Sequence, residues 1–319
     1  MKSIWFKLLS VAFLPLCAAA QSYPNKPIRL VVPWAAGTPA DVAARVVGER
    51  MAIGLGQPIV VDNKPGAAGT IGLTDVLRQP ADGYTLYSLS SASLVAPLLY
   101  PAQKIHFLQA LSPIGHVSWN YNVLVVPTQS PIKSVKDLID AARAKPDGLN
   151  FASGGNGTPA HLAGELFNQQ AGIRAIHVPY NQFPLAVADL LSDRANFMFL
   201  TASAALPQIQ GGKLRPLATT GAHRLPALKD TATMVELGHS AFVLRSFDGF
   251  AAKAGTPPDI IKRLNAELSA ALSSLEVRQR FVPLALEVDP MLPEAFGKVV
   301  ATESEKWLAI AHDAGIAAK

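Results

Sequence analysis

Short aliphatic runs separated by helix-forming segments recur along this 319-residue chain and restrict its fold more than any other feature. Residues 28–32 and 59–61 are two such runs, and between them Val42, Val46 and Met51 recur at helical spacing. Runs without polar alternation are typical of parallel strands that helices bury on both faces. The sequence therefore predicts an α/β fold with a parallel-rich sheet and flanking helices.

This strand and helix pattern occurs in two series. The first continues with a strand at 85–89, and the regular spacing then lapses after residue 100 in a stretch that contains proline and aromatic residues. In the second series we expect strands at 123–126, 149–152, 173–178, 197–200 and 214–219, and helices at 136–144, 162–169 and 185–191. An extended segment at 242–251 and two amphipathic helices follow. Since this tail has no sheet of its own, we expect it to pack on the first series.

The N-terminal residues have the three parts of a secretory signal. Lys2 and Lys7 precede an apolar stretch at 8–16, and three alanines at 18–20 form an A-x-A cleavage site before Gln21. A membrane anchor is the alternative, but this run is well short of the roughly 20 residues that span a bilayer. We therefore expect an exported protein whose mature chain begins at Gln21.

Cysteine content and charge narrow the classes of partner. The one cysteine, Cys17, lies in the expected signal, so we expect no disulfide and no cysteine-ligated metal in the mature chain. A lipidated cysteine is a minor alternative, because residues 14–16 lack the small side chains expected before one. The net charge of +5 includes the two signal lysines, and no basic cluster is present. The sequence therefore indicates neither nucleic-acid nor membrane binding.

The segment 31–45 reads as a strand, a loop of small residues and a helix. Thr38 is suited to the N-cap, Pro39 to the first helical position, and Asp41 can return a hydrogen bond to the loop. A helix start of this kind presents backbone N–H groups and suits an anion. The same cap also occurs in helices whose start is purely structural, so it does not by itself predict a site.

A close copy of this loop lies in the second series. Gly-Thr-Pro-Ala-Asp at 37–41 is matched by Gly-Thr-Pro-Ala-His at 157–161, which follows a glycine-rich turn at 153–156. A third copy at 255–259 begins a helix whose position suggests a structural cap. Because the first two copies fall in different halves, both helix starts can converge on one negatively charged ligand, with backbone donors and a threonine hydroxyl from each.

The sequence lacks the motifs of several common classes of enzyme. The turn at 154–158 has no lysine and is not a phosphate loop, and the glycines at 65–72 have the wrong spacing for a dinucleotide site. There is no G-x-S-x-G, no H-E-x-x-H and no pair of histidines at i, i+4. We therefore predict no catalytic residue, no metal and no cofactor.

A few single side chains are candidates for contact with a ligand. His161, at the third helical position, either touches the ligand or serves as a surface or capping residue. The aromatic residues Trp34, Trp119, Tyr180 and Phe183 lie beside loops or strand ends and either stack on a ligand or complete the core. The ligand role is stronger for Trp34 and Tyr180.

Many segments that match one receptor family occur in the family's order along nearly the whole mature chain. They are Tyr-Pro-Asn-Lys-Pro-Ile-Arg at 23–29, Val-Pro-Trp-Ala-Ala-Gly at 32–37 with Asp41 and Arg45, Gly-Gln-Pro at 56–58, Asp-Asn-Lys-Pro-Gly at 62–66, Asp-Gly-Tyr-Thr-Leu at 82–86, Lys-Ser-Val-Lys-Asp-Leu at 133–138, Ser-Gly at 153–154 with His161, Val-Pro-Tyr at 178–180, and Gly-Thr-Pro at 255–257 with Arg263. Together they resemble the Bug/TctC family, the periplasmic solute receptors of tripartite tricarboxylate transporters.

The resemblance implies a two-lobe periplasmic binding protein with a Venus flytrap fold. After a signal peptide at 1–20, domain I would comprise 21–122 and 244–319, and domain II 123–243. The implied protein is a periplasmic monomer and no enzyme. It would hold a small organic mono- or dicarboxylate, aromatic acids included, and pass it to integral membrane transporter subunits.

The family's carboxylate-binding loops correspond to Trp34–Asp41 and Ser153–Thr158. The predicted ligand-binding residues are Trp34, Ala35, Ala36, Gly37, Thr38, Asp41, Ser90, Ser91, Ser153, Gly154, Gly157, Thr158, His161 and Tyr180. The chain departs from the family at 181–184, which replaces a basic-glycine pair, and at Asn196 and Leu200, where acids are common. The loss of those acids argues against a ligand that bears an amino group.

Two other functions stay open on the sequence. A receptor that signals through a membrane partner would have the same sequence features as a transport receptor. A secreted hydrolase that uses Asp41, His161 or Asp248 as acid and base is less favoured, because the chain has no paired nucleophile and base motif.

Overall fold

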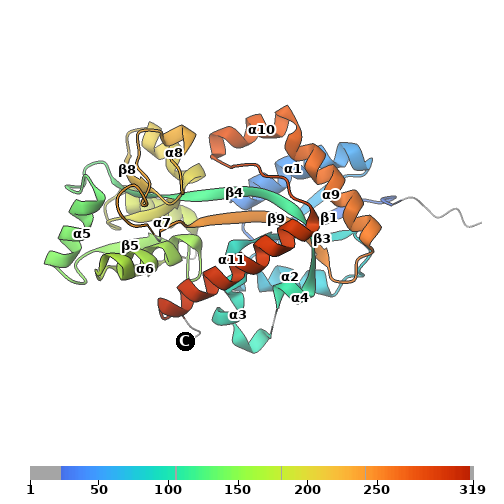
Figure 1. Ribbon diagram of the computed structural model, residues 1–319, viewed down its shortest axis with the longest axis horizontal. Coiled ribbons are helices and arrows are strands. Elements are labelled where there is room, and N and C mark those ends of the chain that lie inside the picture. The colour runs from blue at the N-terminus through green and yellow to red at the C-terminus, as the bar shows by residue number, and fades with distance from the viewer. Residues whose placement is uncertain (1–22, 105, 181, 241, 317–319) are drawn as a thin grey trace, which may run out of the picture.

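The structure, a computed structural model, describes residues 23–316 except 105, 181 and 241. The expected signal at 1–20, with Cys17 and the mature start at Gln21, lies outside the described residues. Two α/β lobes lie side by side and are joined by the long strands β4 (Leu111–Pro127) and β9 (Arg245–Lys253) (Figure 1). The two-lobe α/β fold predicted from the sequence is therefore confirmed.

The remaining elements alternate as the aliphatic runs predict. The other described strands are β1 (Ile28–Val32), β2 (Ile59–Asn63), β3 (Thr85–Ser90), β5 (Asn150–Ser153), β6 (Ile176–Pro179), β7 (Met198–Thr201) and β8 (Leu214–Thr219). The described α-helices are α1 (Pro39–Leu55), α2 (Thr70–Leu77), α3 (Ala96–Leu99), α4 (Phe107–Ala110), α5 (Val135–Ala144), α6 (Pro159–Ala171), α7 (Phe183–Leu191), α8 (Ala202–Gln210), α9 (Pro258–Ser273), α10 (Leu275–Phe281) and α11 (Pro293–Asp313). None of these helices is both long enough and apolar enough to cross a membrane.

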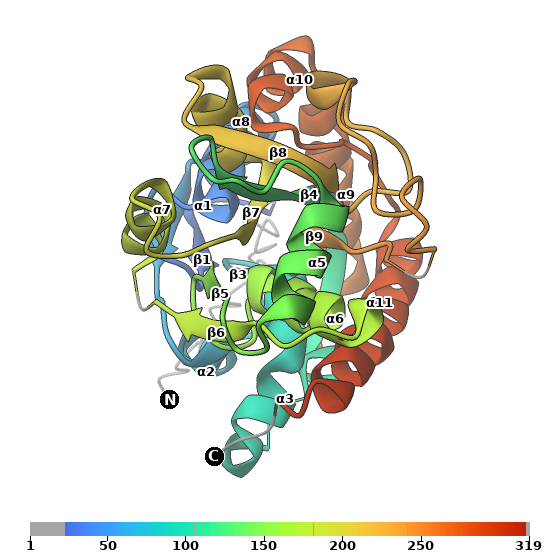
Figure 2. The same ribbon diagram turned by 90° about the vertical axis from the view of Figure 1, so that its left-hand side faces the viewer.

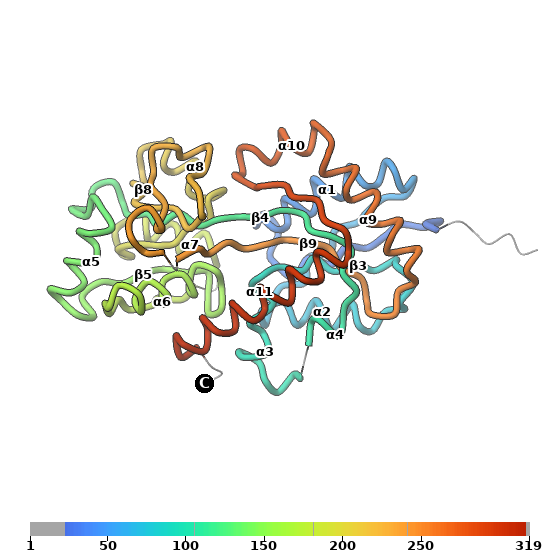
Figure 3. The backbone as a smooth tube through the Cα atoms, in the orientation of Figure 1, coloured from blue at the N-terminus to red at the C-terminus, as the bar shows by residue number. Residues whose placement is uncertain are grey.

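The sheet of the first lobe has the order β2-β1-β3-β9-β4. Strands β2, β1 and β3 are parallel, with Leu30 paired to Val61 and Leu86. Strands β9 and β4 are antiparallel to their neighbours, since β9 brings the chain back from the second lobe and pairs along most of β4 (Figure 3). The predicted parallel strands are thus present, and an antiparallel pair that the sequence did not predict connects the lobes.

Strand β4 corrects the expectation that the regular pattern lapses up to residue 123. Its 17 residues begin at Leu111, well before that point. The pairing of β4 with β9 shifts register between Pro113 and Gly115 and again between His116 and Ser118. These irregularities, and a proline within the strand, conceal the strand from a search for an uninterrupted aliphatic run.

The second lobe is built around the far half of β4. Strands β7 and β8 both pair with β4 in antiparallel orientation. Strands β5 and β6 are parallel, and a parallel bridge from Phe151 to Phe197 connects β5 to the segment that leads into β7. Helix α6 covers this sheet with Leu162 and Phe167, which are fully buried. Each lobe therefore has its own apolar core.

The C-terminal helices pack on the first lobe, and the last one also reaches the second. Leu264 and Leu268 of α9 lie in the first-lobe core. Along α11, Phe296 packs with first-lobe residues, whereas Trp307 joins the second-lobe core that contains Phe167. Figures 1 and 2 both place α11 alongside α3. The expected domain boundaries fall inside β4 and just before β9, and they stay a prediction.

Candidate functional site

The first turns of α1 and α6 border the same cavity between the lobes. Pro39 and Ala40 of α1 line this cleft, and so do Pro159 and Ala160 of α6. The cavity has a volume of about 200 Å³. Because the first N–H groups of a helix lack intrahelical partners, two helix ends with partial positive charge face one space.

The structure brings together eight of the fourteen predicted site residues. Trp34, Thr38, Ser90, Gly154 and Thr158 line the cleft, and Ala35, Ala36 and Gly37 line an adjoining cavity that shares Thr38, Pro39 and Phe183 with it. The six others, which line neither cavity, are Asp41, Ser91, Ser153, Gly157, His161 and Tyr180.

Asp41 stabilises the first loop through hydrogen bonds and does not line the cleft. The side chain is 3% exposed. Its Oδ2 accepts a hydrogen bond from the Gly37 N–H at 2.9 Å, and its Oδ1 accepts one from Asn63 at 2.9 Å. Although burial opposes its charged form, the hydrogen bonds from Arg45, Gly37 and Asn63 lower the pKa of Asp41. Asp41 therefore stays ionised and holds the loop, as the predicted return bond requires.

The two threonine caps differ from each other. Thr38 is at the N-cap of α1, but its side chain makes no capping bond and its hydroxyl donates to the Ala35 carbonyl at 2.8 Å. Thr158 donates in the same way to Gly155 at 2.8 Å and also accepts from the His161 N–H at 3.4 Å. The expected side-chain cap is thus wrong for Thr38 and right for Thr158. Since each hydroxyl proton is used inside its own loop, the backbone N–H groups are the donors left for an anion.

His161 has the role in the second loop that Asp41 has in the first. Its Nδ1 accepts a hydrogen bond from the Gly157 N–H at 3.0 Å, four residues earlier. Gly157 has φ +77°, and a Cβ there would lie 2.4 Å from Leu99 of α3. The positive φ favours glycine at this position, and the nearby side chain of Leu99 leaves little room for a Cβ. The sequence repeat therefore extends to the hydrogen bonds, with an imidazole nitrogen in place of a carboxylate oxygen.

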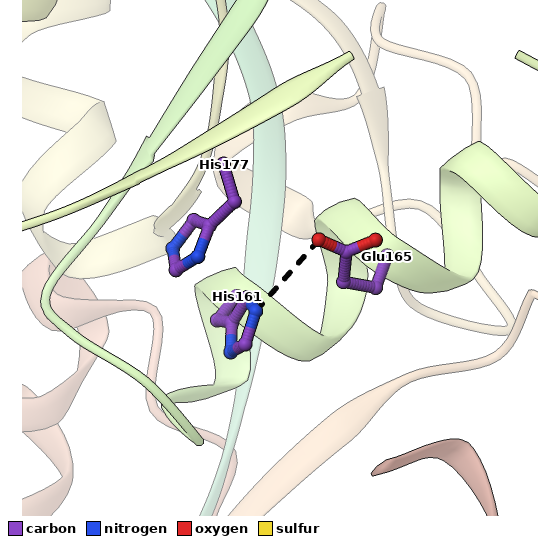
Figure 4. Close-up of side chains that lie close together, drawn as sticks. All are labelled: His161, Glu165 and His177. Carbon is purple, nitrogen blue, oxygen red and sulfur yellow. Dashed lines mark ion pairs between the residues drawn. The ribbon is translucent and has the colours of Figure 1, made fainter. Parts of the chain in front are cut away.

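His161, Glu165 and His177 lie close together behind the second loop (Figure 4). The His161 Nε2 is 3.8 Å from a Glu165 oxygen, and the two imidazole rings stack with centroids 3.8 Å apart and an interplanar angle of 15°. The His177 Nε2 lies 2.6 Å from the Ser153 Oγ. Burial lowers the pKa of His161 to about 4 and that of His177 to about 3.

This cluster does not fit a metal ion. A neutral histidine that binds a metal keeps a proton on its other ring nitrogen, which it donates. The Nδ1 of His161 instead accepts the Gly157 N–H, so Nε2 carries the proton. The stacked rings also cannot both point a lone pair at one ion in their planes. The cluster instead supports the loop through Ser153 and Gly157.

Two of the four aromatic candidates lie in the cleft. Trp34 and Phe183 line the cavity, one from each lobe. Trp119 is 1% exposed, and the guanidinium of Arg245 lies 3.6 Å from its ring centroid. The Tyr180 hydroxyl donates to Asp189 at 2.6 Å within the second lobe. Trp119 therefore completes the core, whereas Tyr180 packs partly buried against the second-lobe core and lines neither cavity, so its ligand role stays a prediction.

Sequence reasoning missed the polar residues that the linking strands supply. Asn120 of β4, Thr201 at the end of β7, and Ser246 and Asp248 of β9 all line the cleft. For Asn120, Ser246 and Asp248 the positions follow from strand alternation on β4 and β9, which could not be assigned without knowing that these strands pair. Asp248 did carry a signal, since it is an acid within the apolar segment 242–251, and it was weighed only as a hydrolase residue.

The family positions that usually carry acids do not face the cleft. The Asn196 Oδ1 accepts a hydrogen bond from the Asn150 N–H at 2.9 Å, and Leu200 is fully buried in the second-lobe core. Neither residue lines either cavity. The positions of Asn196 and Leu200 therefore give no support to the expectation that the loss of acids there argues against an amino group on the ligand.

A larger cavity, of about 980 Å³, lies on the reverse face of the linking strands. Tyr121 and Arg245 line it, and they alternate with the cleft residues Asn120 and Ser246. None of the predicted site residues, all of which are in the described part of the chain, borders it. The cleft is therefore the candidate site.

Two α/β lobes joined by paired strands, with a site between them, define a periplasmic binding protein. A solved Rhodopseudomonas palustris structure, Rpa4515 with adipate, has a TM-score of 0.87 and 30% identity, covering 93% of this chain and 100% of that one. MatC from Rhodopseudomonas palustris with bound malate has a TM-score of 0.83 and 28% identity, covering 90% and 99%. The chain therefore has the fold of this class.

The sequence comparisons give the family. A family model described as tripartite tricarboxylate transporter family receptor matches residues 43–316. Protein BugT from Bordetella pertussis is 33% identical over 309 residues, which are 96% of this chain and 95% of BugT. The chain belongs to the TctC receptor family, and the resemblance stated from its sequence is confirmed.

Proposed function

We propose that this protein is a periplasmic receptor that captures a small organic carboxylate between its lobes and passes it to the membrane subunits of a tripartite tricarboxylate-type transporter. The observation that carries the proposal is that the first turns of α1 and α6, one from each lobe, line one cavity. The structural neighbours crystallised with malate and adipate support the same class of ligand.

The binding follows from the geometry of the two loops. One carboxylate accepts hydrogen bonds from backbone N–H groups at both helix starts, where the helix dipoles favour negative charge. Trp34 and Phe183 form apolar walls, and Asp41 and His161 hold the loops without touching the ligand. Because each lobe provides one half of the site, binding favours the closed arrangement, which the transporter recognises.

The remaining parts of the proposal concern the whole chain. Residues 1–20 direct export and are removed, and the mature protein works as a monomer in the periplasm with no covalent chemistry. Domain I comprises 21–122 and 244–319, and domain II comprises 123–243.

A panel of organic acids tests the proposed function by thermal denaturation. A ligand at a hundredfold excess over its Kd adds about 2.7 kcal/mol to the free energy of unfolding, which raises the melting temperature by about 5 °C. We expect such a shift with one or more mono- or dicarboxylates and none with the corresponding amides and methyl esters. Absence of any shift across the acids, or equal shifts with the amides, contradicts the proposal.

The second loop can be tested with a matched pair of threonine variants. Thr158→Val removes the hydrogen bonds to Gly155 and His161, so we expect the affinity for an acid found in the panel to fall about tenfold. The control is Thr256→Val, which loses a similar 2.8 Å bond to Lys253 at the start of α9, outside the cleft. Equal affinities of the two variants, measured by calorimetry, would show that the second loop does not hold the ligand.

A further inference from the structure

Among the described residues that line the cleft, one side chain is acidic and none is basic. Of the residues that line the cleft and the cavity that adjoins it, Asp248 is the single one with an ionisable side chain. It is 5% exposed, and its Oδ2 accepts a hydrogen bond from Asn120 at 2.8 Å. The site therefore combines two helix starts that attract an anion with a buried carboxyl group that repels one.

Two hydroxyl groups that line the same cleft have no hydrogen-bond partner among the described residues. Ser90 pairs with Asp248 across strands β3 and β9, is 6% exposed, and its Oγ makes no hydrogen bond within the described residues. The Thr201 Oγ1, which comes from the second lobe, is likewise buried without a described partner. Both residues line the cleft. Buried hydroxyls are normally satisfied, so these two point to a polar group of a ligand.

We propose that Asp248 sets the class of ligand by accepting a hydrogen bond from a hydroxyl or ammonium group that the carboxylate carries at its other end. The inference rests on the proposed function, because the helix starts of α1 and α6 hold the carboxylate. The Ser90 and Thr201 hydroxyls complete the contacts of the same donor group, Ser90 from the first lobe and Thr201 from the second. Each end of a ligand with this second group thus contacts both lobes.

The same arrangement disfavours a second carboxylate. A second negative charge would lie next to Asp248 with no lysine or arginine among the lining residues to neutralise it. Burial raises the pKa of Asp248 to about 7, so above that pH its ionised carboxylate repels a second carboxylate. A hydroxyl or ammonium group instead supplies the hydrogen that the carboxyl oxygen lacks.

Two series of acids of matched size test the inference. The aliphatic series is butyrate, 4-hydroxybutyrate, 4-aminobutyrate and succinate, and the aromatic series is benzoate, 3-hydroxybenzoate, 3-(aminomethyl)benzoate and isophthalate. Affinities are measured by calorimetry at pH 8 for the wild-type chain and for Asp248→Asn. Asp140→Asn is the matched control, because it removes the same charge from an exposed position on α5. Asp248→Ser replaces the amide variant if that variant does not fold.

In the wild-type chain we expect a donor-bearing acid to bind about tenfold more tightly than both its unsubstituted parent and the dicarboxylate of its series. Asp248→Asn should remove most of that preference and improve binding of the dicarboxylate, whereas Asp140→Asn should change neither. If acids bind but Asp248→Asn leaves their ranking unchanged, or if the dicarboxylate binds best in the wild-type chain, the inference is wrong and the proposed function stands. If no acid of the series or of the wider panel binds, the proposed function fails and the inference fails with it.

Discussion

Replacing Asp41 with alanine is expected to lower the free energy of unfolding by about 3 kcal/mol and to remove the thermal shift produced by organic acids. The carboxylate is almost fully buried and accepts hydrogen bonds from Gly37, Asn63 and Arg45. Without it the Gly37 N–H has no acceptor and the loop that faces the cleft loses its shape. Chemical denaturation and a melting curve with ligand measure the two effects.

The control for this variant is Asp140→Ala, which removes an acid from an exposed ion pair with Lys136 on α5. Such a pair contributes about 0.5 kcal/mol or less, so this variant should keep its stability and its response to ligand. An Asp41→Ala protein that binds acids as the wild type does would show that Asp41 does not organise the first half of the site.

The lowered pKa of Asp41 predicts how the free energy of unfolding depends on pH. Since its pKa is lowered in the folded protein, Asp41 contributes stability above its unfolded pKa of about 4, and this stability is lost as the pH falls through the folded value. The difference in stability between the wild type and Asp41→Ala should therefore be constant from about pH 5 upward and shrink in stronger acid. A difference that instead grows below pH 4 contradicts this assignment.

Replacing Trp307 with alanine is expected to lower the free energy of unfolding by about 4 kcal/mol. The side chain is fully buried in the second-lobe core, and its Nε1 donates to Glu303 at 3.0 Å. The variant leaves a cavity and deprives the buried Glu303 of a donor. Since Trp307 packs α11 into the second-lobe core, the loss measures how much this contact contributes to the stability of the protein.

Urea denaturation compares Trp307→Ala with Leu275→Ala, whose side chain is 70% exposed at the start of α10. The exposed variant should change the stability by less than about 0.5 kcal/mol. A Trp307→Ala protein within about 1 kcal/mol of the wild type would show that α11 is not anchored through this residue.

Local chemistry was enough to predict the two α/β series and the two loops, whereas the two-lobe arrangement came from the family resemblance. The aliphatic runs at 28–32 and 59–61 became β1 and β2, and the prolines at 39 and 159 mark the first residues of α1 and α6. The return bond of Asp41 to its loop was also predictable, since it depends on residues four positions apart. These features are set by neighbours in the sequence.

The features that were missed depend on contacts between distant residues. Strand β4 contains Pro113 and two shifts of register, and it becomes regular only by pairing with β9, more than a hundred residues later. Asp248 faces the cleft because of the alternation of that same pair of strands. The Thr38 hydroxyl donates to the Ala35 carbonyl and makes no side-chain capping bond to α1. The sequence pattern does not distinguish between these two local hydrogen bonds.

The central claim is that both loops hold one carboxylate through backbone N–H groups. Titration of isotopically labelled protein with an acid from the panel, followed by amide NMR, tests it most directly. We predict that the amide resonances of Ala40 at the start of α1 and of Ala160 at the start of α6 shift together, with the same apparent Kd. Shifts confined to one of the two loops, or shifts at the reverse cavity near Arg245 in place of both, would contradict a site shared between the lobes.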